Sequence, residues 1–384
     1  MKFNTGAKIG VNVILYIITF YWIAIQFNIN IYNLLTPKSP IFLLVMMALL
    51  TLLVIKNNKN NIKKTDMGII IILGIIILLN ALFNNSNIGS IINIFVFVIM
   101  LVITEYIKIS DKTIRTLALI ILLFNLIWIH IGKAGYNLNT VANSSVIMLA
   151  ISCILLYKGR KVHHTIFICI ITIYILYKNT IIIISSNSRG ALLALIGFLV
   201  IRYCISSKIL TNRWIYSILI YCLSFGSLVF VGVYTWLWKN NINNMMIGGK
   251  SLFTGREMIW YEIFEKFKKL PFSGVGSNIT LESYPSLNLH NAIYMLLVIY
   301  GIWVFSIVMY LLLRNIFKNR IIIRHDKIAK GAFAAICAIL INSFFETALI
   351  NKEIYPSVLM LFAILNSRRN IYSIKEKSSV YEKN

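Results

Sequence analysis

Apolar runs of 15 to 25 residues recur along the whole chain, and short polar segments separate them. A helix rises about 1.5 Å per residue, so a run of this length crosses a hydrocarbon layer of roughly 30 Å. The pattern therefore predicts an all-α, polytopic integral membrane helix bundle. About twelve transmembrane spans are expected, near residues 9–28, 40–55, 67–84, 88–107, 114–132, 141–157, 165–185, 190–207, 214–238, 291–313, 331–350 and 353–367.

Most connections between these spans are short, which is typical of antiparallel neighbours in a bundle. The exception is the segment 239–290, about fifty residues long. We expect this loop to carry function, because a long loop in an otherwise economical chain usually does. No repeat or linker divides the chain, so residues 1–384 are expected to form a single membrane domain with a basic tail at 368–384.

The long loop contains a pattern typical of a short amphipathic helix. Thr254 and Glu257 have the spacing of a capping box, in which the first residue caps the helix and the second bonds back. Apolar residues then follow at positions i, i+3, i+4 and i+7, namely Trp260, Ile263, Phe264 and Phe267. A helix is therefore predicted here, with its apolar face on the bilayer surface or on the bundle.

Composition agrees with a membrane protein, since 59% of the residues are apolar, 13% are charged and the mean hydropathy is +0.81. These values exclude a soluble domain of this size. With the N-terminus inside, the expected cytoplasmic segments hold 26 of the 37 Lys and Arg residues. This bias predicts a multi-pass protein of the cytoplasmic membrane with both termini cytoplasmic and the 239–290 loop extracytoplasmic. The net charge of +25 then reflects topology and attraction to anionic lipid, and nucleic acid is not an expected partner.

Two arginines on the expected outer side are candidate functional residues, and the first of them is a candidate for anion binding. Arg256 lies in the first turn of the loop helix, where a cation opposes the helix dipole unless something anionic is bound. Arg189 lies at the outer hinge between two spans, where a lone charge is costly unless it faces a polar cavity. For both residues the alternative is an arginine that extends to the lipid headgroups.

His290 lies where the long loop re-enters the membrane, so it meets both water and a substrate embedded in the bilayer. A neutral imidazole can accept a proton from an attacking hydroxyl. The alternative is an inert histidine at the interface, and His130 is a more distant candidate.

Several kinds of chemistry lack support in the sequence. All three aspartates lie on the expected cytoplasmic side, and the outer glutamates show no ligand spacing with histidine, so no metal site is expected. Nucleotide-binding motifs and a serine-hydrolase elbow are also missing, and no cofactor is expected. The ionisable groups Glu105 and Glu346, within expected spans, do not form the relay of an ion-coupled transporter, although Glu346 is placed to line a cavity.

Four features together resemble the O-antigen ligase and O-antigen polymerase superfamily. They are Ser188-Arg189-Gly190 at an outer hinge, Gly255-Arg256 followed by Trp260, the segment 271–276 with Gly274 and Gly276, and His290-Asn291 at the end of the loop. The resemblance covers roughly residues 165–313. It implies that Arg189 and Arg256 hold the pyrophosphate of an undecaprenyl-linked glycan and that His290 acts on the acceptor hydroxyl. Ser188, Gly190, Gly274, Gly276 and Asn291 are the supporting residues of these motifs.

The resemblance implies a metal-independent glycosyltransferase that polymerises undecaprenyl-pyrophosphate-linked repeat units into a capsular, extracellular or O-antigen polysaccharide. Membrane lipid and other membrane proteins of polysaccharide assembly are expected partners. A ligase that moves the finished glycan to a terminal acceptor is the first alternative. A lipid-linked oligosaccharide flippase is the second, and it would carry charged groups along a central path instead of at the outer face.

Overall fold

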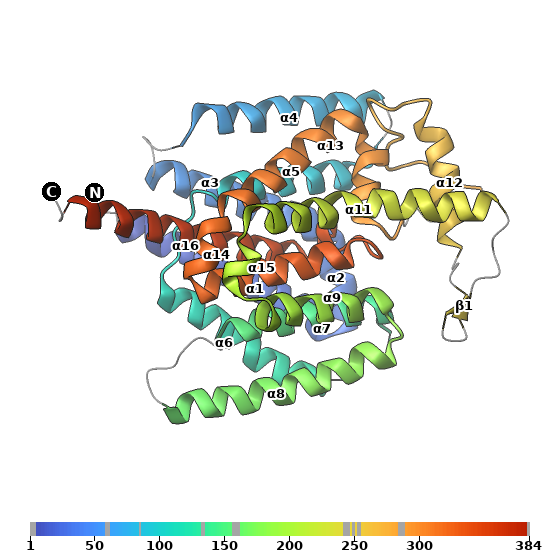
Figure 1. The fold of residues 1–384 in the computed structure, drawn as a ribbon. Coiled ribbons are helices and arrows are strands. Elements are labelled where there is room, and N and C mark those ends of the chain that lie inside the picture. Colours follow the sequence, from blue (N-terminus) through green and yellow to red (C-terminus); the bar gives the residue numbers. More distant parts are fainter. Residues whose placement is uncertain are drawn as a thin grey trace.

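The fold is helical, as the sequence predicts, and is described from a computed structural model covering residues 5–57, 62–83, 86–131, 135–155, 162–240, 246–247, 250–251, 255–282 and 289–381. The one exception within this part of the chain is an antiparallel ladder of two residues on each side, β1 (Met246–Ile247) and β2 (Lys250–Ser251), in the long loop. Figure 1 shows the long helices side by side.

Each expected span overlaps one helix, and these helices are α1 (Thr5–Phe27), α3 (Ser39–Asn57), α4 (Lys64–Phe83), α5 (Ile88–Ile103), α6 (Asp111–Trp128), α7 (Leu138–Ser152), α8 (Val162–Ser185), α9 (Arg189–Leu199), α11 (Arg213–Lys239), α13 (Ala292–Lys318), α15 (Lys327–Asn342) and α16 (Tyr355–Tyr381). Shorter helices are α2 (Ile29–Leu35), α10 (Ser207–Leu210), α12 (Arg256–Phe267) and α14 (Arg320–His325). In the described part of the chain, five helical segments are long and apolar enough to cross a membrane: Ile9–Phe27, Ile29–Lys56, Ile166–Ser185, Arg213–Lys239 and Ala292–His325. The arrangement is consistent with a helical membrane protein.

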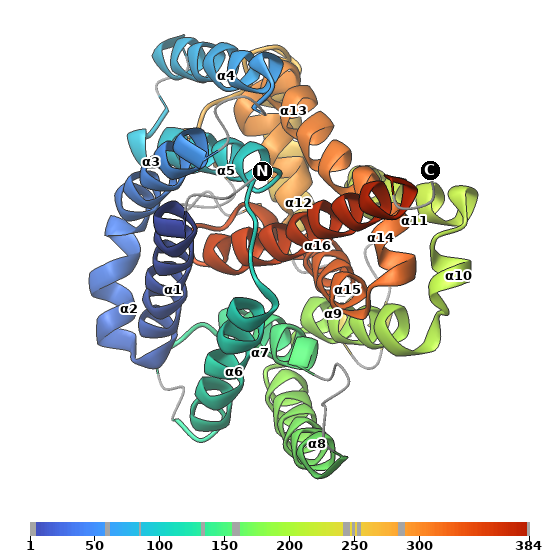
Figure 2. The ribbon, with the colours of Figure 1, turned by 90° about the vertical axis from the view of Figure 1, so that its left-hand side faces the viewer.

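The core lies around α15 and α16, which occupy the centre of the bundle when it is seen along its axis (Figure 2). Small residues on α15, such as Ala332 and Ala335, let its neighbours approach closely. The peripheral helix α8 instead exposes large apolar side chains, including Ile170, Ile173 and Ile184. An outer surface of this kind suits lipid, because lipid tails solvate apolar side chains that water does not.

Several helix ends differ from the expected spans. The helix expected over 331–350 ends at Asn342, and a turn leads to the 3₁₀ helix η4 (Ala348–Ile350). The span expected over 190–207 stops being α-helical at Leu199 and continues as the π-helix η3 (Val200–Cys204). At the C-terminus, α16 continues to Tyr381 and includes most of the basic tail.

The segment 271–276 packs into a break in α13. Gly301 has a φ of 78° and a non-helical ψ of 171°, which interrupts the helix there. The N–H of Val275 donates to the carbonyl of Val298 at 2.8 Å, and the N–H of Ile302 donates to that of Pro271 at 2.9 Å. A Cβ at Gly274 or Gly301 would overlap backbone atoms of the other segment. The positive φ of Gly274, 75°, and of Gly276, 78°, confirms that the glycines permit this approach.

The helix predicted in the long loop is confirmed as α12. Its N-cap is Gly255, with a φ of 84°, whereas the expected cap Thr254 lies outside the described residues. The N–H of Gly255 donates to Glu257 Oε1 at 3.0 Å, so the glutamate bonds back to the residue after the expected cap. Trp260, Ile263 and Phe267 are buried on the bundle, while Phe264 is 44% exposed. The apolar face of α12 therefore rests on the protein, between α11 and α13.

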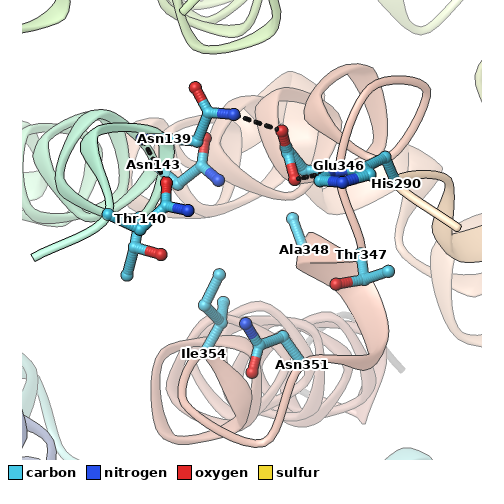
Figure 3. Close-up of a pocket in the computed structure, with 10 residues that line it drawn as sticks. Asn139, Thr140, Asn143, His290, Glu346, Thr347, Ala348, Asn351 and Ile354 are labelled. Atoms are coloured by element: carbon cyan, nitrogen blue, oxygen red, sulfur yellow. Dashed lines mark hydrogen bonds and ion pairs between the residues drawn. The ribbon is translucent and has the colours of Figure 1, made fainter. Parts of the chain in front are cut away.

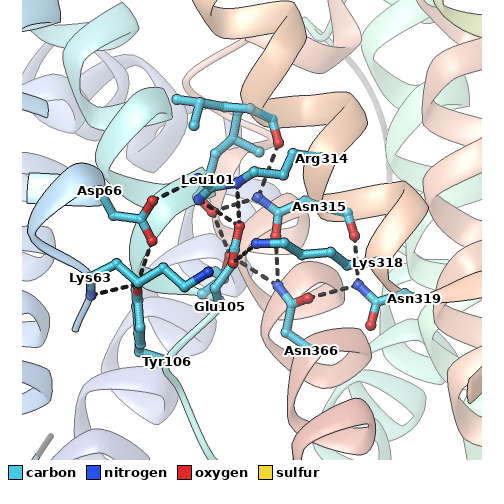
Figure 4. Close-up of polar contacts among 12 residues, drawn as sticks. Lys63, Asp66, Leu101, Glu105, Tyr106, Arg314, Asn315, Lys318, Asn319 and Asn366 are labelled. Carbon is cyan, nitrogen blue, oxygen red and sulfur yellow. Dashed lines mark hydrogen bonds and ion pairs between the residues drawn. The ribbon is translucent and has the colours of Figure 1, made fainter. Parts of the chain in front are cut away.

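An ionic cluster joins α4, α5 and α13 at the opposite end of the bundle, where both termini also lie (Figures 1 and 4). Arg314 donates to Asp66 at 2.6 Å and to Glu105 at 2.9 Å, and Lys318 contacts Glu105 at 2.6 Å. Burial alone raises the pKa of Asp66, but hydrogen bonds from Tyr106 and Arg314 outweigh it and leave the pKa below its ordinary value. Glu105 thus belongs to a structural ion cluster far from Glu346.

Candidate functional site

Three polar side chains from distant parts of the chain converge on Glu346, in the turn that follows α15. Figure 3 shows two of them, Asn139 and His290. Arg256 Nη2 lies 3.2 Å from Oε1 of Glu346, and Asn139 Nδ2 donates to the same oxygen at 2.9 Å. His290 Nδ1 lies 3.0 Å from the other oxygen, Oε2. Glu346 is 12% exposed, and the arginine and histidine side chains are each 24% exposed. The carboxylate therefore links two of the residues that the sequence singled out.

Arg256 is fixed by its place on α12 and by the turn that carries Glu346. Its Nη1 donates to the carbonyl of Phe345 at 2.7 Å, so two of its five N–H groups have protein acceptors here. The carboxylate also offsets the cost of a cation at a helix N-terminus, for which the sequence leaves open a bound anion or an extension to the lipid headgroups. Trp260 anchors the helix, because its Nε1 donates to the carbonyl of Leu289 at 2.6 Å.

His290 is held in the left-handed region, with a φ of 46°, which is uncommon for a residue with a side chain. The next residue, Asn291, is fully buried and caps α13 by accepting from the N–H of Tyr294 at 2.9 Å. Its Nδ2 donates to the carbonyl of Phe344 at 3.1 Å, which ties the start of α13 to the Glu346 turn. These bonds fix the imidazole beside the carboxylate. If Nδ1 carries the proton of the neutral imidazole and donates it to Glu346, Nε2 has no proton and can accept one. A general base needs an acceptor nitrogen of this kind.

Arg189 is the first residue of α9, whose N-terminal end packs on the same turn. Its neighbour Gly190 packs directly on Phe345, because a Cβ at position 190 would lie 2.7 Å from the Phe345 Cβ. Ser188 is the buried N-cap of α9, although its side chain makes no capping bond. Arg189 itself is exposed.

Tyr234 of α11 lies near both arginines. The charges of Arg189, Arg256 and Glu257 all act on its hydroxyl group. Glu257 is buried, and its Oε2 has no hydrogen-bond partner among the described residues. The side of the site near Tyr234 therefore holds two guanidinium groups and one carboxylate.

A cavity of about 80 Å³ opens on the other side of Glu346. His290 and Glu346 form one wall, and Thr140 and Asn143 of α7 face them across it (Figure 3). The sequence predicts Glu346 as a cavity residue, whereas the asparagines of α7 are not predicted. A signal was present, because Asn139 and Asn143 are four residues apart and therefore share one face of an apolar helix.

Other candidate residues lie elsewhere. Gly274 and Gly276 contact the break in α13, where their role is to admit the neighbouring backbone. His130 is exposed, and its Nε2 lies 3.1 Å from the hydroxyl of Tyr174. The structure thus brings Arg256 and His290 together on Glu346 and packs Gly190, the neighbour of Arg189, against the same turn.

No protein-family profile and no curated protein matches the sequence.

Proposed function

We propose that the protein is a membrane glycosyltransferase that polymerises undecaprenyl-pyrophosphate-linked repeat units into a surface polysaccharide. The observation that carries this proposal is the convergence of Arg256 and His290 on Glu346, with Gly190, the neighbour of Arg189, packed against the same turn. An anion-binding group and a candidate general base within one polar site are what glycosyl transfer from a pyrophosphate requires.

The proposed topology has twelve crossings, a cytoplasmic location for both termini and an extracytoplasmic location for the 239–290 loop. The Glu346 site then lies at the outer surface of the cytoplasmic membrane. A polyprenyl chain would remain in the bilayer, its pyrophosphate would meet the arginines at the headgroup level, and the sugars would extend into water.

In the proposed reaction, a hydroxyl of the acceptor sugar attacks the anomeric carbon of the lipid-linked sugar. A bond forms between that oxygen and the anomeric carbon, and the bond from carbon to the phosphate oxygen breaks. His290 Nε2 takes the hydroxyl proton, and undecaprenyl pyrophosphate leaves with the electron pair. Arg189 and Arg256 stabilise the charge that develops on the pyrophosphate. The sugar-pyrophosphate bond supplies the driving force, so neither a metal nor a nucleotide is needed.

A deletion of the gene tests the proposal, with the surface glycan examined on a gel. Single repeat units on the acceptor indicate a polymerase, whereas loss of every capped acceptor indicates a ligase. Accumulation of lipid-linked units on the cytoplasmic side indicates a flippase, and an unchanged glycan contradicts all three functions.

Site variants extend the test in the same strain. Arg189→Ala, Arg256→Ala and His290→Ala are each expected to abolish polymerisation while the protein still inserts into the membrane. Arg213→Ala is the matched control, because Arg213 is an exposed arginine at the start of α11, away from the site. Normal chain length in all three site variants would refute the assignment.

A further inference from the structure

The cavity beside Glu346 is neutral apart from the residues of the site itself. Among the described residues, no lysine or arginine lines it. Its other polar wall residues all carry amides or hydroxyls, and they are Asn137, Asn139, Thr140, Asn143, Thr347 and Asn351. Amides and hydroxyls both donate and accept hydrogen bonds, as sugar hydroxyls do. The wall chemistry therefore suits an uncharged polyhydroxylated ligand.

Protein contacts fix the orientation of two of these amides. Asn143 Oδ1 accepts from Asn342 Nδ2 at 2.8 Å, and Asn351 Oδ1 accepts from the N–H of Glu353 at 3.0 Å. These bonds fix which end of each amide is the donor, and neither Nδ2 group donates to a described residue. Each Nδ2 group can therefore donate to a ligand, and sugar hydroxyl, ring and glycosidic oxygens provide suitable acceptors.

Glu346 separates this cavity from the arginines. Its Oε1 accepts from Arg256 on one side and from Asn139 on the other, so the carboxylate lies between the two regions. A pyrophosphate inside the cavity would face this negative charge without a lining cation. A neutral hydroxyl would instead meet His290 and Glu346 as acceptors.

We propose that the cavity is the subsite for the acceptor sugar and that it selects a neutral, polyhydroxylated ring, while the pyrophosphate of the donor stays on the Arg256 side of Glu346. This inference rests on the proposed function and adds the division of the site into two regions. The acceptor hydroxyl enters from the asparagine wall and meets the imidazole that removes its proton.

Two conservative variants test the subsite in the purified protein. The donor is the lipid-linked saccharide that accumulates in cells lacking the gene, and the acceptor is the water-soluble saccharide released from that pool by mild acid. Thr140→Val and Thr347→Val each replace a cavity hydroxyl with a methyl group of similar volume. Loss of one hydrogen bond should raise the KM for the acceptor about 3- to 10-fold, with kcat and the KM for the donor within about twofold of wild type. Thr116→Val on α6, outside the cavity, is the control.

The outcomes separate the two proposals. A rise in the donor KM with an unchanged acceptor KM would assign the cavity to the donor, and no change in either would remove it from sugar binding. If the wild-type protein extends no saccharide, the proposed function fails. Saturation-transfer NMR with a saccharide cut from the cell's surface glycan then still tests the cavity. Weaker transfer to Thr140→Val than to wild type supports the subsite, and equal transfer overturns it.

Discussion

Replacing Glu346 with glutamine removes one negative charge and almost no volume, so it isolates the role of the carboxylate. In the wild type, Arg256 Nη2 lies 3.2 Å from Oε1 of Glu346, and the amide oxygen of glutamine can still accept a hydrogen bond from it. The amide nitrogen then faces His290 Nδ1, which lies 3.0 Å from Oε2 in the wild type. Two N–H groups cannot donate to each other, so the ring proton must move to Nε2. The imidazole would then present a donor to the acceptor hydroxyl and could no longer remove its proton.

The expected loss of kcat follows from general base catalysis, because the tautomer decides whether His290 Nε2 can accept a proton. General base catalysis contributes roughly 10²- to 10⁴-fold, so kcat of Glu346→Gln should fall by about 10²-fold or more. The variant also weakens the three hydrogen bonds at the carboxylate, from Arg256, Asn139 and His290, because a neutral amide accepts less strongly than a charged group, whose hydrogen bonds contribute about 1.5–3 kcal/mol each. Because Arg256 and His290 are each 24% exposed, solvent screens part of this term. The free energy of unfolding should fall by about 1–2 kcal/mol, too little to unfold the protein.

Extension kinetics on the purified protein and thermal unfolding followed by size-exclusion chromatography measure the two effects separately. Glu282→Gln is the matched control, because Glu282 is an exposed glutamate in the 239–290 loop and its replacement makes the same change of charge. A wild-type kcat in Glu346→Gln would refute the orienting role of the carboxylate. A loss of activity accompanied by unfolding at the assay temperature would show that the carboxylate acts on stability and not on the imidazole.

Three further predictions concern the scaffold and the topology. Gly274→Ala should abolish folded, detergent-stable protein, because the new Cβ meets the backbone at the break in α13; a normal elution profile would contradict this packing. The lowered pKa of Asp66 means that its stabilising interaction with Arg314 is complete above the ordinary carboxyl range, near pH 4, and is lost as the pH falls through the lowered value. Asp66→Asn should therefore lose stability at pH 7 and approach the wild type in acid, as measured by unfolding between pH 7 and pH 3. In a cysteine-free background, Lys268→Cys should react with an impermeant maleimide in intact cells and Lys112→Cys only after permeabilisation; the reverse result would invert the proposed topology.

Much of the helical framework follows from local features of the chain. The apolar runs predict the positions of the long helices because helix length and hydropathy depend on neighbouring residues alone. The helix of the long loop is predicted for the same reason, since the spacing of Trp260, Ile263 and Phe267 places them on one face. Arg256 and His290 stand out in the sequence because a charged or titratable residue at a helix start near the membrane is costly without a partner.

The partners of these residues are decided by the tertiary structure. Glu346 lies 90 residues after Arg256 and 207 after Asn139, and no local pattern relates such positions. Hydropathy also conceals the turn that presents Glu346, because the apolar residues Phe344, Phe345 and Leu349 continue the run of α15 beyond its last helical residue. Hydropathy measures how strongly a segment prefers an apolar environment to water. It does not record which neighbours form hydrogen bonds or ion pairs with its polar groups. Helix packing settles that question here, by placing a carboxylate from one turn between an arginine, a histidine and an asparagine from three other elements.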